Sequence, residues 1–179
     1  MTTIAVLLAD GFEEIEAVTI IDVLRRAGLT VHTLGLNGLD VKGAHGIAFM
    51  ADARLDETTD FDALVLPGGM PGSAVLRDDV RVLAMLRRHA QEQRTVAAIC
   101  AAPMALGAAG VLEGRRATCY PGFEEHLAGA ERCTDRVVVD GPVITSRGPG
   151  TAMDFALELV SRLASPEKAQ ELRSGMLVA

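Results

Sequence analysis

Strand-forming runs alternate with helical segments along the whole chain, and this alternation restricts the fold more than any other feature of the sequence. The main predicted strands cover residues 3–9, 29–36, 62–66, 95–99 and 116–119. The main predicted helices cover residues 13–27, 80–93 and 101–110. Central strands that are apolar throughout are typical of a parallel sheet with both faces covered. The pattern predicts an α/β fold: a flavodoxin-like, doubly wound, mostly parallel sheet with helices on both faces, in three layers.

The remaining segments fit the same single domain, residues 1–179. Residues 41–51 predict small strands in a hairpin or at the sheet edge, and residues 123–127 a helical turn. Residues 137–145 predict a tight hairpin, because Asp140-Gly141 supplies the positive φ that such turns require. We expect Thr151 to cap the last long helix and a short helix over residues 167–174 to follow it.

Composition and charge exclude several classes of protein. The net charge is −7 and the 17 basic residues are scattered, which argues against nucleic acid or an anionic membrane as the partner. Three cysteines at irregular spacing indicate neither a disulfide framework nor a zinc site, so we expect no metal. Because the start of the chain lacks the pattern of a signal peptide and no apolar segment could span a bilayer, we expect a soluble, cytoplasmic protein.

Cys100 stands at an abrupt strand-to-helix turn, between the apolar run that ends at Ile99 and a helix that begins at once. Such a turn lifts the thiol above the carboxyl edge of the sheet and points first-turn N–H groups, including that of Ala101, at the sulfur. We expect these dipoles to lower the pKa of Cys100 below the ~8.5 of a free thiol and to make the sulfur nucleophilic. The alternative is that Cys100 is a small buried hydrophobic residue.

Glu16 is the natural partner for Cys100. Steps of four, seven and eleven residues along the first helix lead to Ile20, Val23 and Ala27, so Glu16 lies on the buried stripe. Burial and a nearby thiolate would raise its pKa, and the protonated carboxyl could donate a hydrogen bond or exchange a proton. A helix-dipole role explains Glu13 and Glu14 but not a carboxyl that faces the core.

Glycine-rich loops supply the other candidate groups. Pro67-Gly68-Gly69 follows a strand, and glycines there let backbone N–H groups approach a ligand, as in an oxyanion hole. Residues 146–151 are glycine-rich but lack the spacing of nucleotide-binding loops, so we expect no nucleotide and no other cofactor. His32, His45 and His89 look like surface or strand residues. His126 looks like an exposed helical residue, and the alternative is a base at the rim of the site.

Four ordered motifs resemble the ThiJ/PfpI superfamily, also called the DJ-one family: residues 9–16, 65–69, 97–103 and 145–151. The resemblance runs from the first strand to the terminal helix. It implies a flavodoxin-like homodimer in which Cys100 is the reactive thiol, Glu16 is hydrogen-bonded to it, and Gly68 and Gly69 line the pocket. Arg147 and Pro149 would belong to the loop beside the site, near the dimer interface.

Members of the family are described as cofactor-independent glyoxalases, protein deglycases, redox-responsive chaperones and proteases. The site histidine of many members is absent here, because its two usual positions hold Ala101 and Tyr120. A protease would need a Cys–His pair and is therefore disfavoured. We expect a stress-response protein that acts on small reactive carbonyls, with Tyr120 assisting Glu16. The alternative is a non-catalytic sensor or chaperone that works through oxidation of Cys100 to sulfinate.

Overall fold

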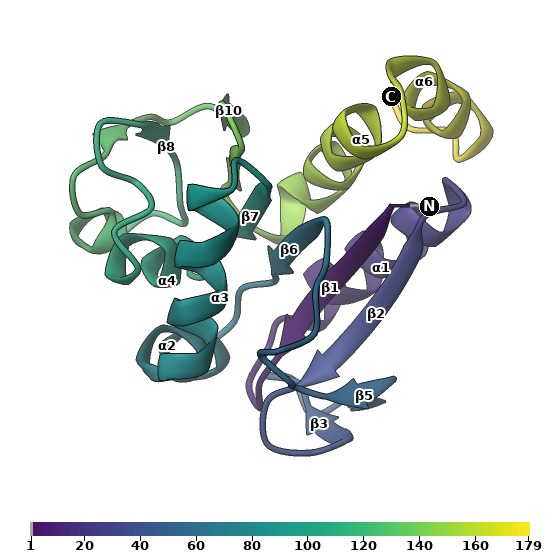
Figure 1. Cartoon of the computed structure of the whole chain (residues 1–179). Helices are drawn as coiled ribbons and strands as arrows, with labels where there is room; N and C mark the ends of the chain where they lie inside the picture. The colour runs from purple at the N-terminus through teal and green to yellow at the C-terminus, as the bar shows by residue number, and fades with distance from the viewer. Residues whose placement is uncertain (1) are drawn as a thin grey trace.

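Seven strands form the central sheet of the computed structural model, which describes residues 2–179 (Figure 1). Their order is β10–β11–β7–β6–β1–β2–β5, and all neighbours are parallel except β10 and β11. The strands are β1 (Thr3–Leu8), β2 (Thr30–Gly35), β5 (Ala53–Arg54), β6 (Ala63–Leu66), β7 (Thr95–Ile99), β10 (Val137–Asp140) and β11 (Val143–Ser146). The predicted flavodoxin-like, mostly parallel sheet is confirmed.

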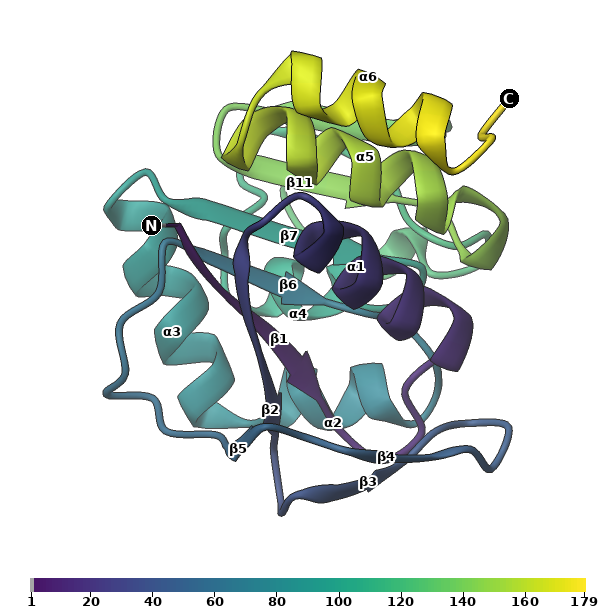
Figure 2. The same ribbon diagram turned by 90° about the vertical axis from the view of Figure 1, so that its right-hand side faces the viewer.

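Alternate side chains of each strand build two separate cores, one on each face of the sheet. In β1, Ile4 and Val6 belong to one core while Ala5 and Leu7 belong to the other, as the two-residue repeat of a strand requires. The first core is covered by α1 (Glu14–Arg26) and α5 (Ala152–Leu163), with α6 (Pro166–Gly175) packed on α5 (Figure 2). The second core is covered by α2 (Gly72–Asp78), α3 (Val80–Gln91) and α4 (Pro103–Ala108).

Short elements complete the described chain. The expected hairpin is formed by β3 (Asp40–Lys42) and β4 (Ala48–Met50), which pair antiparallel. A parallel pair, β8 (Arg116–Ala117) and β9 (Glu131–Arg132), lies beyond the main sheet. Two 3-10 turns are η1 (Glu124–His126), where a helical turn was expected, and η2 (Pro149–Thr151). Among the described residues, no helix combines the length and the apolarity needed to cross a bilayer.

The structure differs from the sequence predictions at α2, β5 and the start of α5. Neither α2 nor β5 was predicted, because α2 begins with a helix-breaking Gly and β5 is only two residues long. Thr151 makes no side-chain cap on α5. Its hydroxyl instead accepts hydrogen bonds from the backbone N–H groups of Arg147 and Gly148, 3.2 and 3.1 Å away, and so closes the preceding loop. The predicted cap is therefore wrong.

The topology gathers three loops at one edge of the sheet. From β1 the chain passes to β2 on one side and later to β6 and β7 on the other. The loops after β1, β6 and β7 therefore leave the sheet beside one another at its carboxyl edge, where ligands bind in folds of this kind. These are the loops that carry Gly11, Gly68 and Cys100.

Candidate active site

Cys100 sits in a strained backbone conformation that its neighbours hold in place. Its φ is +65°, in the left-handed region that a residue with a Cβ rarely adopts. Its N–H donates to Ser146 O at 3.0 Å, and its carbonyl accepts from the Tyr120 N–H at 2.8 Å. These two bonds attach the turn to the end of β11 and to the loop after β8. The conformation carries the side chain out of the strand direction at the start of the helical turn.

Glu16 is completely buried in the first turn of α1. Its Oε2 accepts a 2.7 Å hydrogen bond from the Gly68 N–H, while its Oε1 is buried without a hydrogen-bond partner. Burial raises the pKa of Glu16 to about 7, against the Gly68 hydrogen bond and the Cys100 side chain, which lower it. The sequence prediction of a buried carboxyl with a raised pKa agrees with this arrangement.

Glycine is required where the loops meet. A Cβ on Gly68 would lie 2.4 Å from Cys100 Cβ and 2.7 Å from Glu16 Oε2. Gly69 has a φ of +91°, and a Cβ there would lie 2.5 Å from Gly11 O. The three loops therefore pack closely, and no side chain fits at Gly68 between Cys100 and Glu16.

The structure raises the pKa of the Cys100 thiol rather than lowering it. Burial is the largest cause and the Glu16 carboxylate the next, and together they raise the pKa to about 12 against the N–H groups of Gly69 and Ala101. The expectation of a lowered pKa is therefore wrong beside an ionised Glu16. Once Glu16 holds a proton, its charge no longer opposes the thiolate, so the ionisation of each group depends on the other.

The backbone donors divide into two sets. The N–H groups of Gly69 and Ala101 point at the Cys100 sulfur, as the strand-to-helix turn predicts for Ala101. The N–H of Gly68 is already used by Glu16 Oε2. Gly68 therefore holds the carboxyl in position and is not free to bind a substrate oxygen, while Gly69 and Ala101 face the reacting atom.

Tyr120, Arg147 and Pro149 share one hollow of about 340 Å³ beside the Cys100 turn. Tyr120 is 44% exposed, and its ring lies against Gly148, where a Cβ would be 3.1 Å from Tyr120 Cδ2. The residues that line this hollow are Tyr120, Pro121, Thr134, Arg136, Arg147, Gly148, Pro149, Gly150 and Thr151. The sequence brought the three residues forward only through the family resemblance. Their shared hollow depends on loops that the sequence leaves undefined.

Two histidines, His89 and His45, have polar partners of their own. His89 is fully buried, with Nδ1 2.9 Å from Met85 O and Nε2 3.0 Å from Phe61 O, so the expectation of a surface or strand position is wrong. His45 is exposed and lies 3.0 Å from Glu14 Oε2, with Glu13 nearby. Glu14 already accepts hydrogen bonds from the backbone N–H groups of His45 and Ile47. The polar groups of Glu14 and His45 are therefore paired with one another and with the β3–β4 hairpin.

Comparison with known proteins identifies the relatives of the chain. Residues 2–162 match the DJ-1/PfpI family. Protein DJ-1 homolog B of Arabidopsis thaliana is 46% identical over 176 residues, which are 96% of this chain but 40% of the relative. The chain thus spans less than half the length of that relative. Protein dj-1beta of Drosophila melanogaster is 43% identical, over 97% of this chain and 96% of its own. The glutathione-independent glyoxalase DJR-1.2 of Caenorhabditis elegans is 36% identical, over 93% and 91%.

Solved structures agree with the sequence comparisons. Drosophila melanogaster DJ-1beta superposes with a TM-score of 0.94 at 41% identity, over 99% of this chain and 98% of the other. Oxidised Toxoplasma gondii DJ-1 superposes with a TM-score of 0.96 at 37% identity, over 100% of both chains. The chain therefore shares its overall fold with these proteins over nearly its whole length.

Proposed function

This chain belongs to the DJ-1/PfpI family, and from that premise we propose that it converts small α-oxoaldehydes, such as methylglyoxal or glyoxal, to 2-hydroxy acids. No cofactor enters the proposed reaction. A relative of 36% identity is named a glutathione-independent glyoxalase, which supports this class of reaction. The observation that carries the proposal is the free, buried Oε1 of Glu16 beside the Cys100 turn.

The first step is addition of the Cys100 sulfur to the aldehyde carbon. The C–S bond forms while the thiol proton passes to Glu16 and then to the former carbonyl oxygen, which gives a hemithioacetal. Because the pKa of Cys100 is raised, the thiol needs a base as it reacts, and Glu16 Oε1 is the acceptor that Gly68 holds in place. The Gly69 and Ala101 N–H groups would stabilise charge on the oxygen.

The second step moves hydrogen between adjacent carbons. Glu16 removes the proton from the sulfur-bearing carbon and returns it to the neighbouring carbon. The hydroxyl proton of the hemithioacetal passes to the oxygen of that neighbouring carbon, and the product is a thioester of the 2-hydroxy acid. Water then cleaves the C–S bond, and the proton returns to the thiolate. A carboxyl with a pKa of about 7 can both accept and donate a proton near neutral pH, which suits this exchange.

Turnover of methylglyoxal by the purified protein tests the proposal, with D- and L-lactate measured over time. Cys100→Ser should abolish lactate formation, whereas Cys133→Ser, which changes a thiol outside the site, should not. General base catalysis contributes ~10²–10⁴-fold, so a site that uses Glu16 without histidine should be slow. Tyr120→Phe should lower the rate if the phenol assists, and Tyr120→His should raise it. Wild-type protein without activity, or active Cys100→Ser, would overturn the proposal.

A redox sensor is the second candidate, because a protonated Glu16 could donate to a sulfinate on Cys100. Two molecules of peroxide would oxidise the thiolate to sulfinate and leave two of water. The neighbour from Toxoplasma gondii is described as oxidised, which supports this chemistry in the family. Peptide mass spectrometry after mild peroxide should find two added oxygens on Cys100 and none on Cys119. An unchanged end product in Glu16→Ala or Glu16→Asp would contradict the role of Glu16.

We also infer that the protein forms a homodimer through α1 and the β3–β4 hairpin. Ile15, Val18 and Ile47 are 59%, 50% and 61% exposed and line one apolar hollow with Phe12 and Phe49. An exposed apolar cluster of this kind is typical of a protein interface. Light scattering should give a dimer for wild type and a monomer for Val18→Asp. Val80→Asp, which adds the same charge at a 77% exposed valine elsewhere, is the control.

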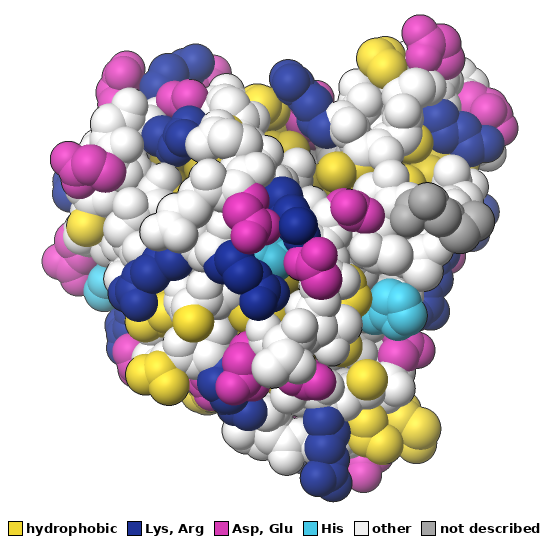
Figure 3. Space-filling model, in the orientation of Figure 1, with side chains coloured by type: hydrophobic (Ala, Val, Ile, Leu, Met, Phe, Trp, Pro, Cys, Tyr) yellow, Lys and Arg dark blue, Asp and Glu magenta, His cyan; other side chains and the backbone are white. Residues whose placement is uncertain are grey.

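The partner is expected to be a small aldehyde rather than nucleic acid. Basic and acidic side chains are interspersed over the face seen in Figure 3, without a continuous basic area. We expect the reaction to occur in the cytoplasm, whose reductants keep thiols such as Cys100 free to react.

A further inference from the structure

The hollow beside the Cys100 turn contains an arginine without a carboxylate partner. Arg147 is half-buried, its Nη1 donates to Thr134 O at 3.0 Å, and its guanidinium makes no ion pair with the described residues. No Asp or Glu stands among the described residues that line the hollow. The backbone beneath it is fixed, because Thr151 Oγ1 accepts from the Arg147 N–H.

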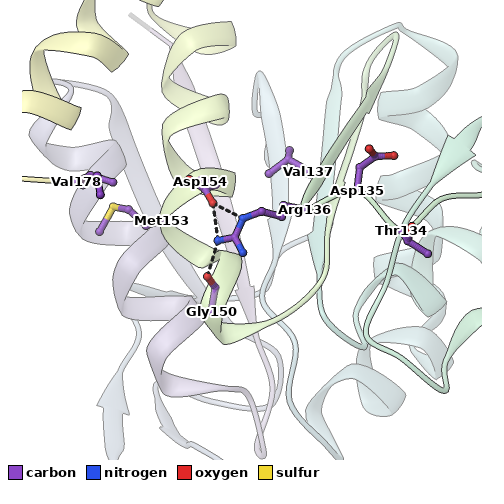
Figure 4. A pocket seen from close by; sticks show the side chains of 9 residues that line it. Thr134, Asp135, Arg136, Val137, Gly150, Met153, Asp154 and Val178 are labelled. Atoms are coloured by element: carbon purple, nitrogen blue, oxygen red, sulfur yellow. Dashed lines mark hydrogen bonds and ion pairs between the residues drawn. The ribbon is translucent and has the colours of Figure 1, made fainter.

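Arg136, which lines the same hollow, differs in having its charge balanced. Its Nε and Nη2 both donate to Asp154 Oδ2, at 2.8 and 2.7 Å, and Nη2 also donates to Gly150 O (Figure 4). Asp154 lies in the groove next to the hollow and not in the hollow itself. The uncompensated positive charge of the hollow therefore belongs to Arg147.

The hollow is attached directly to the Cys100 turn. One of its walls is Tyr120, whose N–H binds the carbonyl of Cys100. Another is Arg147, which follows Ser146, the residue whose carbonyl accepts the N–H of Cys100. A molecule held in the hollow therefore lies against residues that are one hydrogen bond, or one residue, from the nucleophile. A planar guanidinium with free donors recognises carboxylate and phosphate oxygens well.

We propose that this hollow is an anion subsite in which Arg147 binds the carboxylate or phosphate of a compound whose other end reaches Cys100. The inference rests on the proposed function in one respect, since it names which aldehydes the site prefers: those that also carry an anionic group. The 2-hydroxy acid product is itself a carboxylate and would bind there as well. Tyr120 forms the apolar side of the subsite, and the Thr134 carbonyl orients the guanidinium.

Competition between two thiol reagents of nearly equal size tests the subsite without turnover. Iodoacetate carries a carboxylate and iodoacetamide does not, so the ratio of their rates at Cys100 measures the preference for an anion. The ratio at Cys100 of wild type should exceed that of N-acetylcysteine. Arg147→Gln should lower it about tenfold, the factor that corresponds to one charge-assisted hydrogen bond. Arg147→Lys, which keeps the charge, should retain part of it.

Arg132→Gln is the matched control. Arg132 is exposed and lies outside the hollow. The positive charges of Arg132 and Arg147 both act to lower the pKa of the Cys119 thiol, so the two arginines are comparable in their general electrostatic effect on this region. A general effect of net charge would lower the ratio equally in both variants and would overturn the proposal. So would a wild-type ratio no higher than that of N-acetylcysteine. The melting temperature of each variant is measured alongside, and the lysine variant keeps the test valid should the glutamine variant fold poorly.

Protection of Cys100 from iodoacetamide separates the two possible anions. Lactate and inorganic phosphate are compared with lactamide, which is neutral and close to lactate in shape. Protection by lactate or phosphate, lost in Arg147→Gln, supports the subsite and shows which anion it takes, whereas equal protection by lactamide contradicts it. A protein that makes no lactate from methylglyoxal yet shows this protection would refute the proposed function alone. One that makes lactate without any anion preference would refute the subsite alone.

Discussion

Replacing Glu16 with glutamine isolates the energetic effect of burying its carboxyl, because the two side chains have nearly the same shape. The hydrogen bond from the Gly68 N–H to Oε2 can be kept by the amide oxygen of glutamine. The amide cannot ionise, so the stability of the glutamine variant lacks the pH dependence that the buried carboxyl gives the wild-type protein. Comparing the two proteins over a range of pH therefore measures the ionisation of Glu16.

Burial raises the pKa of Glu16 from 4.5 to about 7. Each pKa unit corresponds to ~1.36 kcal/mol, so ionisation in the folded state costs about 3 kcal/mol. Because the folded pKa is raised, the favourable contribution of the protonated carboxyl is complete below pH 4.5 and is lost as pH rises through about 7. Between pH 5 and pH 8 wild type should thus lose about 2.5 kcal/mol relative to Glu16→Gln.

Urea denaturation of both proteins at several pH values from 5 to 8 measures this difference. In a chain of this size the corresponding melting temperatures should diverge by roughly 5–10 °C. Cys100→Ser as a shared background removes any contribution from the thiol, and Glu125→Gln, at an exposed position, gives the baseline for loss of a surface carboxyl. A difference that stays constant from pH 5 to pH 8 would refute the conclusion that burial controls Glu16.

Three further predictions follow from the same region and from the opposite core. Gly68→Ala should lower the free energy of unfolding by about 1–3 kcal/mol, since its Cβ would lie 2.4 Å from Cys100 Cβ; a change within ~0.5 kcal/mol in urea would contradict this. Burial and the Glu16 carboxylate raise the pKa of Cys100, so the rate of its alkylation by iodoacetamide should still increase above about pH 9 in wild type. Glu16→Gln removes the carboxylate and should shift the pH profile of this rate to lower pH; identical profiles would disprove the coupling. Burial lowers the pKa of His89, so its contribution to stability should be lost as pH falls below ~6.5; His89→Gln should flatten that part of the stability curve, and an unchanged curve would count against it.

The sequence by itself determined the fold class and most of the main strands and helices. Apolar runs such as residues 62–66 and 95–99 cannot be exposed, and a strand that is apolar on both faces requires helices on both sides of the sheet. The sequence also placed Cys100 at a strand-to-helix turn and Glu16 on the buried stripe of a helix. Both conclusions depend on the local periodicity of apolar residues, which can be determined from neighbouring positions in the sequence.

Only the tertiary structure decided what these groups do to one another. The sign of the Cys100 pKa shift depends on burial and on the Glu16 carboxylate, and both outweigh the turn's own N–H groups. Gly68 binds Glu16 rather than a substrate oxygen because the first turn of α1 meets the loop after β6, and the two residues are 52 positions apart in the chain. The Arg147 hollow and the buried His89 likewise depend on segments brought together from distant parts of the chain. Desolvation and charge act through space, so their effect is fixed only when the neighbours in three dimensions are known.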